Sequence, residues 1–238
     1  KADNLDLINT TKIVASDPIL SARIIGIASK AIYGKTPTTL KEAIGRNLGI
    51  STVVNLAVIH SLEESLNDKV DDKILQNILQ ASSTAPRLLK LFKQNSEFED
   101  LLNKDLLEQV LMFGLLGLLI LCHKSAQTHE IVRHCFNGYD DLNTLNQQLF
   151  KLVGQTLFSS SAMMLSLWHL DATVIKSLNT LHKITISNSK QSQTTERLLF
   201  MMSCIFHAIK KERDLFWLEE KAELLNFGGF KEIKQLLI

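Results

Sequence analysis

Proline and glycine are scarce in this chain, with 3 prolines and 10 glycines among 238 residues. β-Sandwiches and barrels need turn residues about every 8–12 positions, so the scarcity argues against an all-β fold and favours helices. An excess of charge is absent too. The formal net charge is +1, which gives no electrostatic sign of a nucleic-acid-binding protein.

Cysteine is also sparse, and no two cysteines form a CxxC pair. Because Cys122, Cys135 and Cys204 are widely spaced, we expect reduced, buried thiols in a cytoplasmic protein. No secretory signal or membrane span is recognisable. The longest uncharged apolar run, 110–122, has 13 residues, whereas a span needs about 20. The first residue is not methionine, so the sequence leaves open whether a further segment precedes it.

Apolar residues recur at helical spacing along most of the chain. This pattern predicts an all-α fold of about twelve helices, a multi-helix bundle with no strand and no internal repeat. A polar, charged break at residues 67–72 divides the pattern. We therefore predict two lobes, an N-terminal helical lobe at 1–66 and a second helical lobe at 67–238.

Capping residues predict where several helices begin and end. Pro86 predicts a kink or a break near Ala85, and the polar segment 184–194 predicts a mobile loop. We expect N-caps at Asp17 (with Pro18 as the first helical residue), Thr38 or Thr39, Ser51 and Asp171, and helix ends at Gly34 and Gly49.

The most apolar stretch, residues 106–123, is predicted to be one helix at the centre of the fold. No charged or strongly polar side chain occurs between Val110 and Cys122. A helix this apolar has no face for water, so other helices must surround it. Gly114 and Gly117 lie about one turn apart and would let a neighbouring backbone approach closely.

Four segments along the chain match the motifs of one known family: residues 16–25 with Tyr33-Gly34, Ala43-Ile44-Gly45-Arg46-Asn47-Leu48-Gly49, Phe113-Gly114-Leu115-Leu116, and Leu167-Trp168-His169-Leu170-Asp171 followed by Leu181-His182. In this order they resemble the motifs of the HDOD domain, the HD-related output domain of bacterial signalling proteins. Ser29-Lys30 stands where that family has Asn-Ser, and one extra residue precedes Leu48-Gly49. The resemblance implies an all-helical, two-lobed domain related to HD-superfamily phosphohydrolases.

The metal ligands of an HD phosphohydrolase are missing from this sequence. Such an enzyme holds a divalent metal with histidine and aspartate side chains, including an adjacent His-Asp pair, and the metal activates water. The chain contains no His-Asp dipeptide, and Gly117-Leu118 stands at the matching position. The family's later His and Pro positions fall near Leu157 and at Asp171. His182 alone could be a vestige of the site, although we favour its role as a cap at a helix C-terminus.

The remaining histidines do not form a recognisable metal site. His129 and His134 are five residues apart, so they do not share a helix face as the ligands of HExxH do. Solvated positions on a helix edge explain both. We expect the other histidines to lie at core edges or helix ends: His60, His123, His169 and His207.

Motifs for nucleophilic catalysis and nucleotide binding are missing as well. Ser159–Ser161 lacks the GxSxG context and lies in a predicted helix. Neither GxxxxGKS/T nor GxGxxG is present. The basic run 210–213 is interpreted as a cationic helix end, and Met201-Met202 as core. We therefore predict no catalytic residue, no cofactor-binding residue and no metal ligand.

The leading hypothesis is a non-catalytic regulatory domain that binds a partner protein in bacterial signal transduction. It requires no cofactor, nucleic acid or membrane, and the sequence leaves the partner and the oligomeric state open. One alternative is a metal-dependent phosphohydrolase whose ligands the sequence does not reveal. Another is a sensor module that binds a small ligand between the two lobes.

Overall fold

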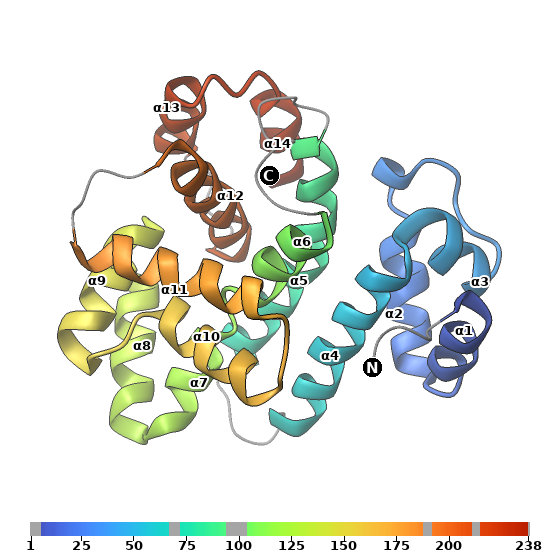
Figure 1. Ribbon diagram of the computed structural model, residues 1–238, viewed down its shortest axis with the longest axis horizontal. Helices are drawn as coiled ribbons and strands as arrows, with labels where there is room; N and C mark the ends of the chain where they lie inside the picture. The colour runs from blue at the N-terminus through green and yellow to red at the C-terminus, as the bar shows by residue number, and fades with distance from the viewer. Residues whose placement is uncertain (1–5, 67–71, 94–103, 188–191, 211–214, 238) are drawn as a thin grey trace. The chain divides into compact units, whose positions relative to one another are not determined.

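The structure is a computed structural model that describes residues 6–66, 72–93, 104–187, 192–210 and 215–237. Within these ranges all regular structure is helical, with fourteen α-helices, one 3-10 turn, one π-helical segment and no strand (Figure 1). The all-α prediction is therefore confirmed.

The chain divides into two compact units, residues 1–66 and 67–238. The polar segment at 67–72 lies almost entirely outside the described residues. That the two units are lobes of one domain stays a prediction, and each unit is described separately below.

The N-terminal unit begins with two helices that are joined by a well-formed cap. Asp17 Oδ1 accepts hydrogen bonds from the amides of Ile19 and Leu20, both at 2.9 Å, and Pro18 is the first residue of α2. The N-cap prediction is confirmed here. In chain order the elements of this unit are α1 (Leu7–Ala15), α2 (Pro18–Ala28), the 3-10 turn η1 (Ala31–Tyr33), α3 (Leu40–Glu42), the π-helical η2 (Ala43–Leu48) and α4 (Ile50–Leu66).

Glycine and threonine set the boundaries that follow α2. Gly34 and Gly49 have φ of 81° and 91°, a region that favours glycine, and each ends the element before it. Thr39 is the N-cap of α3, because its hydroxyl accepts a hydrogen bond from Glu42 N. The expected cap at Ser51 is wrong, since α4 already begins at Ile50 and Ser51 lies inside its first turn.

The C-terminal unit contains the remaining ten helices. Within it α10 packs against α7 and α11, α8 packs against α7 and α9, and α12 packs against α5 (Figure 1). These helices are α5 (Asp72–Lys93), α6 (Lys104–Phe113), α7 (Gly117–Lys124), α8 (Ala126–Gly138), α9 (Leu142–Val153), α10 (Leu157–Leu167), α11 (Ala172–Ser187), α12 (Gln193–Lys210), α13 (Phe216–Leu224) and α14 (Phe230–Leu237).

An aromatic cluster fills part of the core of this unit. The ring centroids of Phe92 and Phe200 are 6.2 Å apart, and that of Phe227 lies 5.4 Å from the first and 5.9 Å from the second. All three rings are buried. Burial of one such ring contributes about 1.5–3 kcal/mol, so the cluster is a main link between α5, α12 and the turn after α13.

Two features of this unit differ from the prediction. The central stretch is two helices, because a turn at residues 114–116 separates α6 from α7. Of the two alternatives predicted near Ala85, a kink or a break, the break is wrong, because α5 runs through Pro86 as one helix. Packing of α5 against α6 and α12 outweighs the hydrogen bond that proline cannot make.

The central stretch is buried as predicted. With its flanking residues, 106–124, it is the one stretch among the described residues that is long and apolar enough to cross a membrane. In its most apolar window 78% of the residues are buried inside the protein. The core helix of a globular protein has the same property.

Candidate functional site

The break in the central stretch is bridged by a serine from α10. Ser161 Oγ donates a hydrogen bond to Gly114 O at 2.8 Å and accepts one from Gly117 N at 2.7 Å. The serine is fully buried. Its hydroxyl thus pairs an amide and a carbonyl that the turn at 114–116 would otherwise leave without helical partners.

Gly117 of α7 lies directly against the backbone of α10. A Cβ placed on Gly117 would lie 1.9 Å from Leu157 O and 2.9 Å from Ser161 N, both backbone atoms. No side chain fits there without moving one helix. This is the position at which the resemblance places the His-Asp pair of a phosphohydrolase, so a packing contact stands where a metal ligand would be.

The neighbouring Leu118, and the positions matched to the family's later His and Pro, near Leu157 and at Asp171, are also used for structure. Leu118 and Leu157 are completely buried. Asp171 Oδ1 accepts a hydrogen bond from Thr173 N at 2.7 Å, so this carboxylate caps the start of α11, as predicted. A capping carboxylate and two core leucines do not offer a set of metal ligands.

His182 does not cap the end of its own helix, contrary to the prediction. α11 continues to Ser187, because Thr185 is buried and its carbonyl accepts a hydrogen bond from Gln147 Nε2 at 3.3 Å. Residues 184–187 are therefore helical, and 188–191 lie outside the described residues. The sequence alone does not reveal this tertiary contact.

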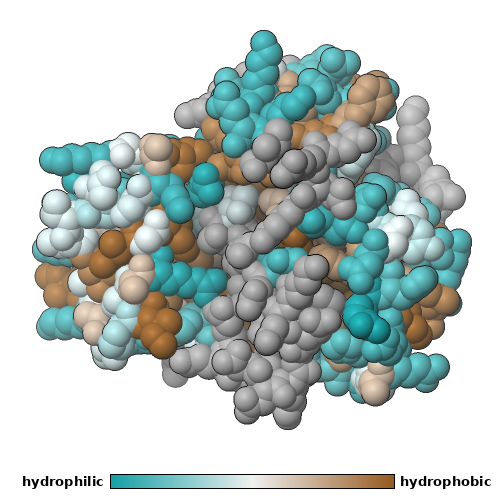
Figure 2. All heavy atoms as spheres, turned by 180° about the vertical axis from the view of Figure 1, so that it is seen from behind, coloured by the Kyte–Doolittle hydropathy of each residue, from teal (hydrophilic) through white to brown (hydrophobic). Residues whose placement is uncertain are grey.

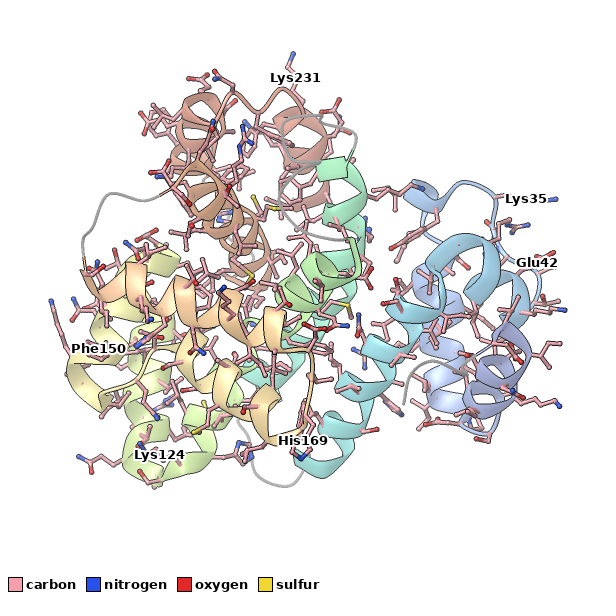
Figure 3. All side chains as sticks on the ribbon, in the orientation of Figure 1. Lys35, Glu42, Lys124, Phe150, His169 and Lys231 are labelled. Atoms are coloured by element: carbon pink, nitrogen blue, oxygen red, sulfur yellow. The ribbon has the colours of Figure 1, made fainter. Side chains whose placement is uncertain are left out.

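His182 instead contacts the cap of a neighbouring helix. Its Nδ1 lies 3.0 Å from the hydroxyl of Thr156, the N-cap residue of α10. The ring of Phe150, labelled in Figure 3, packs edge-on against the imidazole with centroids 6.0 Å apart. Burial, together with the charge of Lys183, lowers the pKa of His182 below its usual value. Through these contacts the His182 side chain of α11 packs against the start of α10.

The remaining histidines of this unit are dispersed. His123 donates from Nδ1 to Leu119 O at 2.7 Å, at the end of α7. His134 is exposed and His129 is half-buried. His169, labelled in Figure 3, follows α10 with φ of 55°. Among the side chains that the structure describes, no three His, Cys, Asp or Glu residues come together as a metal site would require. That the chain holds no metal stays a prediction.

The cysteines and methionines of the core match their expected places. Cys122, Cys135 and Cys204 are buried, and none of the three forms a disulfide bond. Burial raises the pKa of the thiols of Cys135 and Cys204, which disfavours the reactive thiolate. Met202 is buried beside Gly114, where an added Cβ would meet Met202 Cε at 2.5 Å.

Lys210 has a structural role that the sequence did not indicate. Its ammonium lies 2.9 Å from a carboxylate oxygen of Asp140 and donates to the carbonyls of Phe136 and Tyr139 at the end of α8. It also lies 5.4 Å from the centroid of the Phe136 ring. Lys210 therefore stabilises the C-terminus of α8. Residues 211–213 of the basic run lie outside the described residues.

In the N-terminal unit His60 forms a contact that sequence reasoning missed. Its Nε2 lies 3.0 Å from Asp17 Oδ2, which ties α4 to the start of α2. The hydrogen bond from the Leu20 amide, with smaller contributions from His60, holds the pKa of the Asp17 carboxyl below its usual value. The two residues are 43 positions apart, so no local signal could have linked them.

Comparisons with known proteins agree with this fold. The sequence profile of the HDOD domain matches residues 1–184. No curated protein matches the chain significantly. Among solved structures, a protein of Marinobacter aquaeolei VT8 named as a signal transduction protein aligns with 99% of this chain, at a TM-score of 0.54 and 18% identity. This chain spans 56% of that protein's length.

A second similar structure carries a different functional name. It is a protein of Shewanella amazonensis SB2B named as a metal-dependent phosphohydrolase, with a TM-score of 0.58 and 18% identity. The alignment covers 99% of this chain and 86% of that one. At this identity the likeness concerns the fold alone.

Proposed function

This chain belongs to the HDOD domain family, and from this premise we propose that it is a non-catalytic regulatory domain. It acts by binding a partner protein in signal transduction in the bacterial cytoplasm. The observation that carries the proposal is Gly117, which stands where an HD phosphohydrolase has its adjacent metal ligands and which has no room for a side chain.

Hydrolysis of a phosphate ester by an HD-type site depends on a bound metal. The metal lowers the pKa of a water ligand and stabilises charge on the phosphate oxygens, which aliphatic side chains cannot do. Here α7 and α10 meet through the Gly117 backbone, and Ser161 bonds to both sides of the turn. This packing supports the proposal that the domain has the fold of an HD phosphohydrolase without its hydrolytic activity.

The regulatory part of the proposal rests on the family and on the signal-transduction name of one similar structure. A test uses the full chain as bait in cells of its source, with an unrelated helical domain as control bait. We expect at least one captured protein, once purified, to form a complex of fixed stoichiometry with the purified chain. Failure of every captured protein to bind in purified form would contradict the proposal.

The competing function is that of a metal-dependent phosphohydrolase, the name of the other similar structure. It requires three or more ligand side chains around one point at about 2.0–2.6 Å. Metal-dependent turnover of a phosphodiester by the purified chain would support that function and would contradict ours.

A further inference from the structure

Acidic residues are nearly absent from α9, α10 and α11. Asp171 is the only one among the 54 residues 142–195, whereas the whole chain has 25 acidic residues among 238. The carboxylate of Asp171 is already used, because it caps the start of α11 through the amide of Thr173. The same 54 residues contain four lysines, so this part of the C-terminal unit carries a positive charge that the chain as a whole does not.

Three of these lysines lie on neighbouring faces of α9 and α11. Lys176 and Lys183 are exposed and seven residues apart, so they share one face of α11 at a separation of about 10 Å along the helix. Lys151 lies one turn after Gln147, whose side chain donates to Thr185 O, so it is on the side of α9 that meets α11. No carboxylate of the described residues forms an ion pair with these three lysines.

Two exposed apolar side chains accompany the lysines. Phe150, labelled in Figure 3, is 38% exposed and packs edge-on against His182, the residue before Lys183. Ile186 is 40% exposed and lies one turn after His182 on α11. We call Phe150, Lys151, Lys176, Lys183 and Ile186 the basic surface.

Exposed apolar side chains alone do not distinguish this surface from others. Figure 2 shows hydrophobic patches between hydrophilic ones on the opposite face of the molecule as well. Such patches are common on folded proteins. The basic surface differs in combining apolar side chains with lysines that no described carboxylate neutralises.

Stabilisation of helix ends explains only one of the three lysines. Lys151 lies in the last turn of α9, where a cation is favourable. Lys183 lies before the last turn of α11, and Lys176 lies in the second turn of that helix. The effect of the helix dipole is confined to the last turn, so neither lysine of α11 gains from it.

We propose that the basic surface binds an acidic amphipathic helix of the partner protein. Two carboxylates about two turns apart on that helix would pair with Lys176 and Lys183, and an apolar side chain on the same face would cover Phe150 and Ile186. Three lysines would neutralise few phosphates of a nucleic acid, and membrane-binding clusters contain about four to eight basic residues. The inference rests on the proposed function and deepens it by naming the chemistry of the partner.

A titration of the full chain with a labelled peptide tests the proposal. The probe is a synthetic helix of about 18 residues built from glutamate, leucine and alanine, with the glutamates and leucines on one face. The control peptide has glutamine in place of glutamate, and binding is followed by fluorescence anisotropy. We expect saturable binding of the glutamate peptide that weakens at least about threefold between about 50 and 300 mM salt. Absence of saturation, or equal binding of the glutamine peptide, would overturn the proposal.

Charge reversal shows whether the peptide binds at the basic surface. The double variant Lys176→Glu with Lys183→Glu should weaken binding at least about tenfold, and Ile186→Ser should weaken it several-fold. Lys12→Glu with Lys231→Glu is the matched control, because it changes the net charge equally at two exposed lysines of α1 and α14. We expect the control to stay within about twofold of the wild type. Equal loss in the control, or no loss in a folded double variant, would show the proposal to be wrong.

Two variants guard against a fold defect. Lys183→Gln and Lys176→Gln remove one charge each from exposed positions, and each should weaken peptide binding several-fold if the double variant does not fold. Unchanged affinity in both would contradict the proposal.

Two further outcomes would also count against the proposal. Tighter binding of oligothymidylate, or of vesicles made of equal parts phosphatidylcholine and phosphatidylserine, would show that the basic surface recognises phosphate groups. A captured partner protein that binds the charge-reversed variant as tightly as the wild type would overturn the role of the basic surface and leave the proposed function intact. The peptide titration does not depend on capture of a partner, so the two proposals can fail separately.

Discussion

Replacing Gly117 by alanine tests whether the position of the missing metal ligands is a packing contact. The added Cβ would lie 1.9 Å from Leu157 O, and real Cβ contacts essentially never fall below 3.0 Å. α7 and α10 must therefore separate locally by about 1 Å, or the backbone at residue 157 must rearrange.

The cost has two parts. Overpacking of a close-packed core costs about 1–3 kcal/mol. Separation also breaks the 2.7 Å bond from Gly117 N to Ser161 Oγ, and an unpaired buried amide costs about 1–3 kcal/mol more. We therefore expect Gly117→Ala to lower the free energy of unfolding by about 2–6 kcal/mol. For a chain of this length Tm should fall by at least about 4 °C.

The assay is urea and thermal unfolding followed by circular dichroism. Gly138→Ala is the matched control, because a Cβ on Gly138, at the end of α8, meets no atom within 4 Å. We expect this control to change stability by less than about 1 kcal/mol, in the stabilising direction. If Gly117→Ala proves as stable as the wild type, α7 and α10 do not meet as described.

Three further pairs of measurements test the structural roles assigned above. Ser161→Ala should cost about 2–4 kcal/mol because it leaves a buried amide and carbonyl unpaired, whereas Ser160→Ala, which removes a buried hydroxyl without a partner, should be neutral or stabilising. Equal effects in urea unfolding would disprove the bridge. Lys210→Met should cost about 1–3 kcal/mol, and Asp140→Asn, at an exposed carboxylate, less than about 1 kcal/mol. A larger effect at Asp140 would be inconsistent with capping of α8 by the lysine. Because the pKa of folded His182 lies below its unfolded value of about 6.5, the unfolded chain gains the proton first as pH falls. The free energy of unfolding should therefore decrease as the pH falls below about 6.5 and stop decreasing below the folded pKa. His182→Gln should flatten this slope, and an unchanged slope would refute the assignment.

The features that could be predicted from sequence are set by neighbouring residues. Asp17 and Pro18 start α2, Gly49 ends η2, and apolar spacing identifies most helices. The close approach of a neighbouring backbone to Gly117 was also predictable, because glycine has no Cβ that would prevent it.

The features that were missed depend on residues far apart in the chain. Ser161 bonds to Gly114 across 47 positions, and Lys210 bonds to Phe136 across 74. The break between α6 and α7 follows from the first of these contacts, since an isolated apolar sequence favours an unbroken helix. The predicted Ser51 cap failed for a local reason, because Ile50 already continues the helix after Gly49.

The family profile ends at residue 184, before α12 to α14. The motifs quoted for the resemblance also end near that point, at His182. The family profile therefore does not cover the last three helices, whereas the two similar structures align with 99% of the chain. Met202 of α12 lies beside Gly114, so this helix packs against the central turn.

The most direct test of the central claim is metal analysis combined with turnover on one preparation. The full chain is purified without chelators, its bound metal is measured by mass spectrometry, and hydrolysis of cyclic dinucleotides and guanosine polyphosphates is followed with added Mn²⁺ or Mg²⁺. An active HD phosphodiesterase serves as the positive control. Our account predicts far less than one metal ion per chain and no turnover. Stoichiometric, tightly bound metal together with turnover would contradict it.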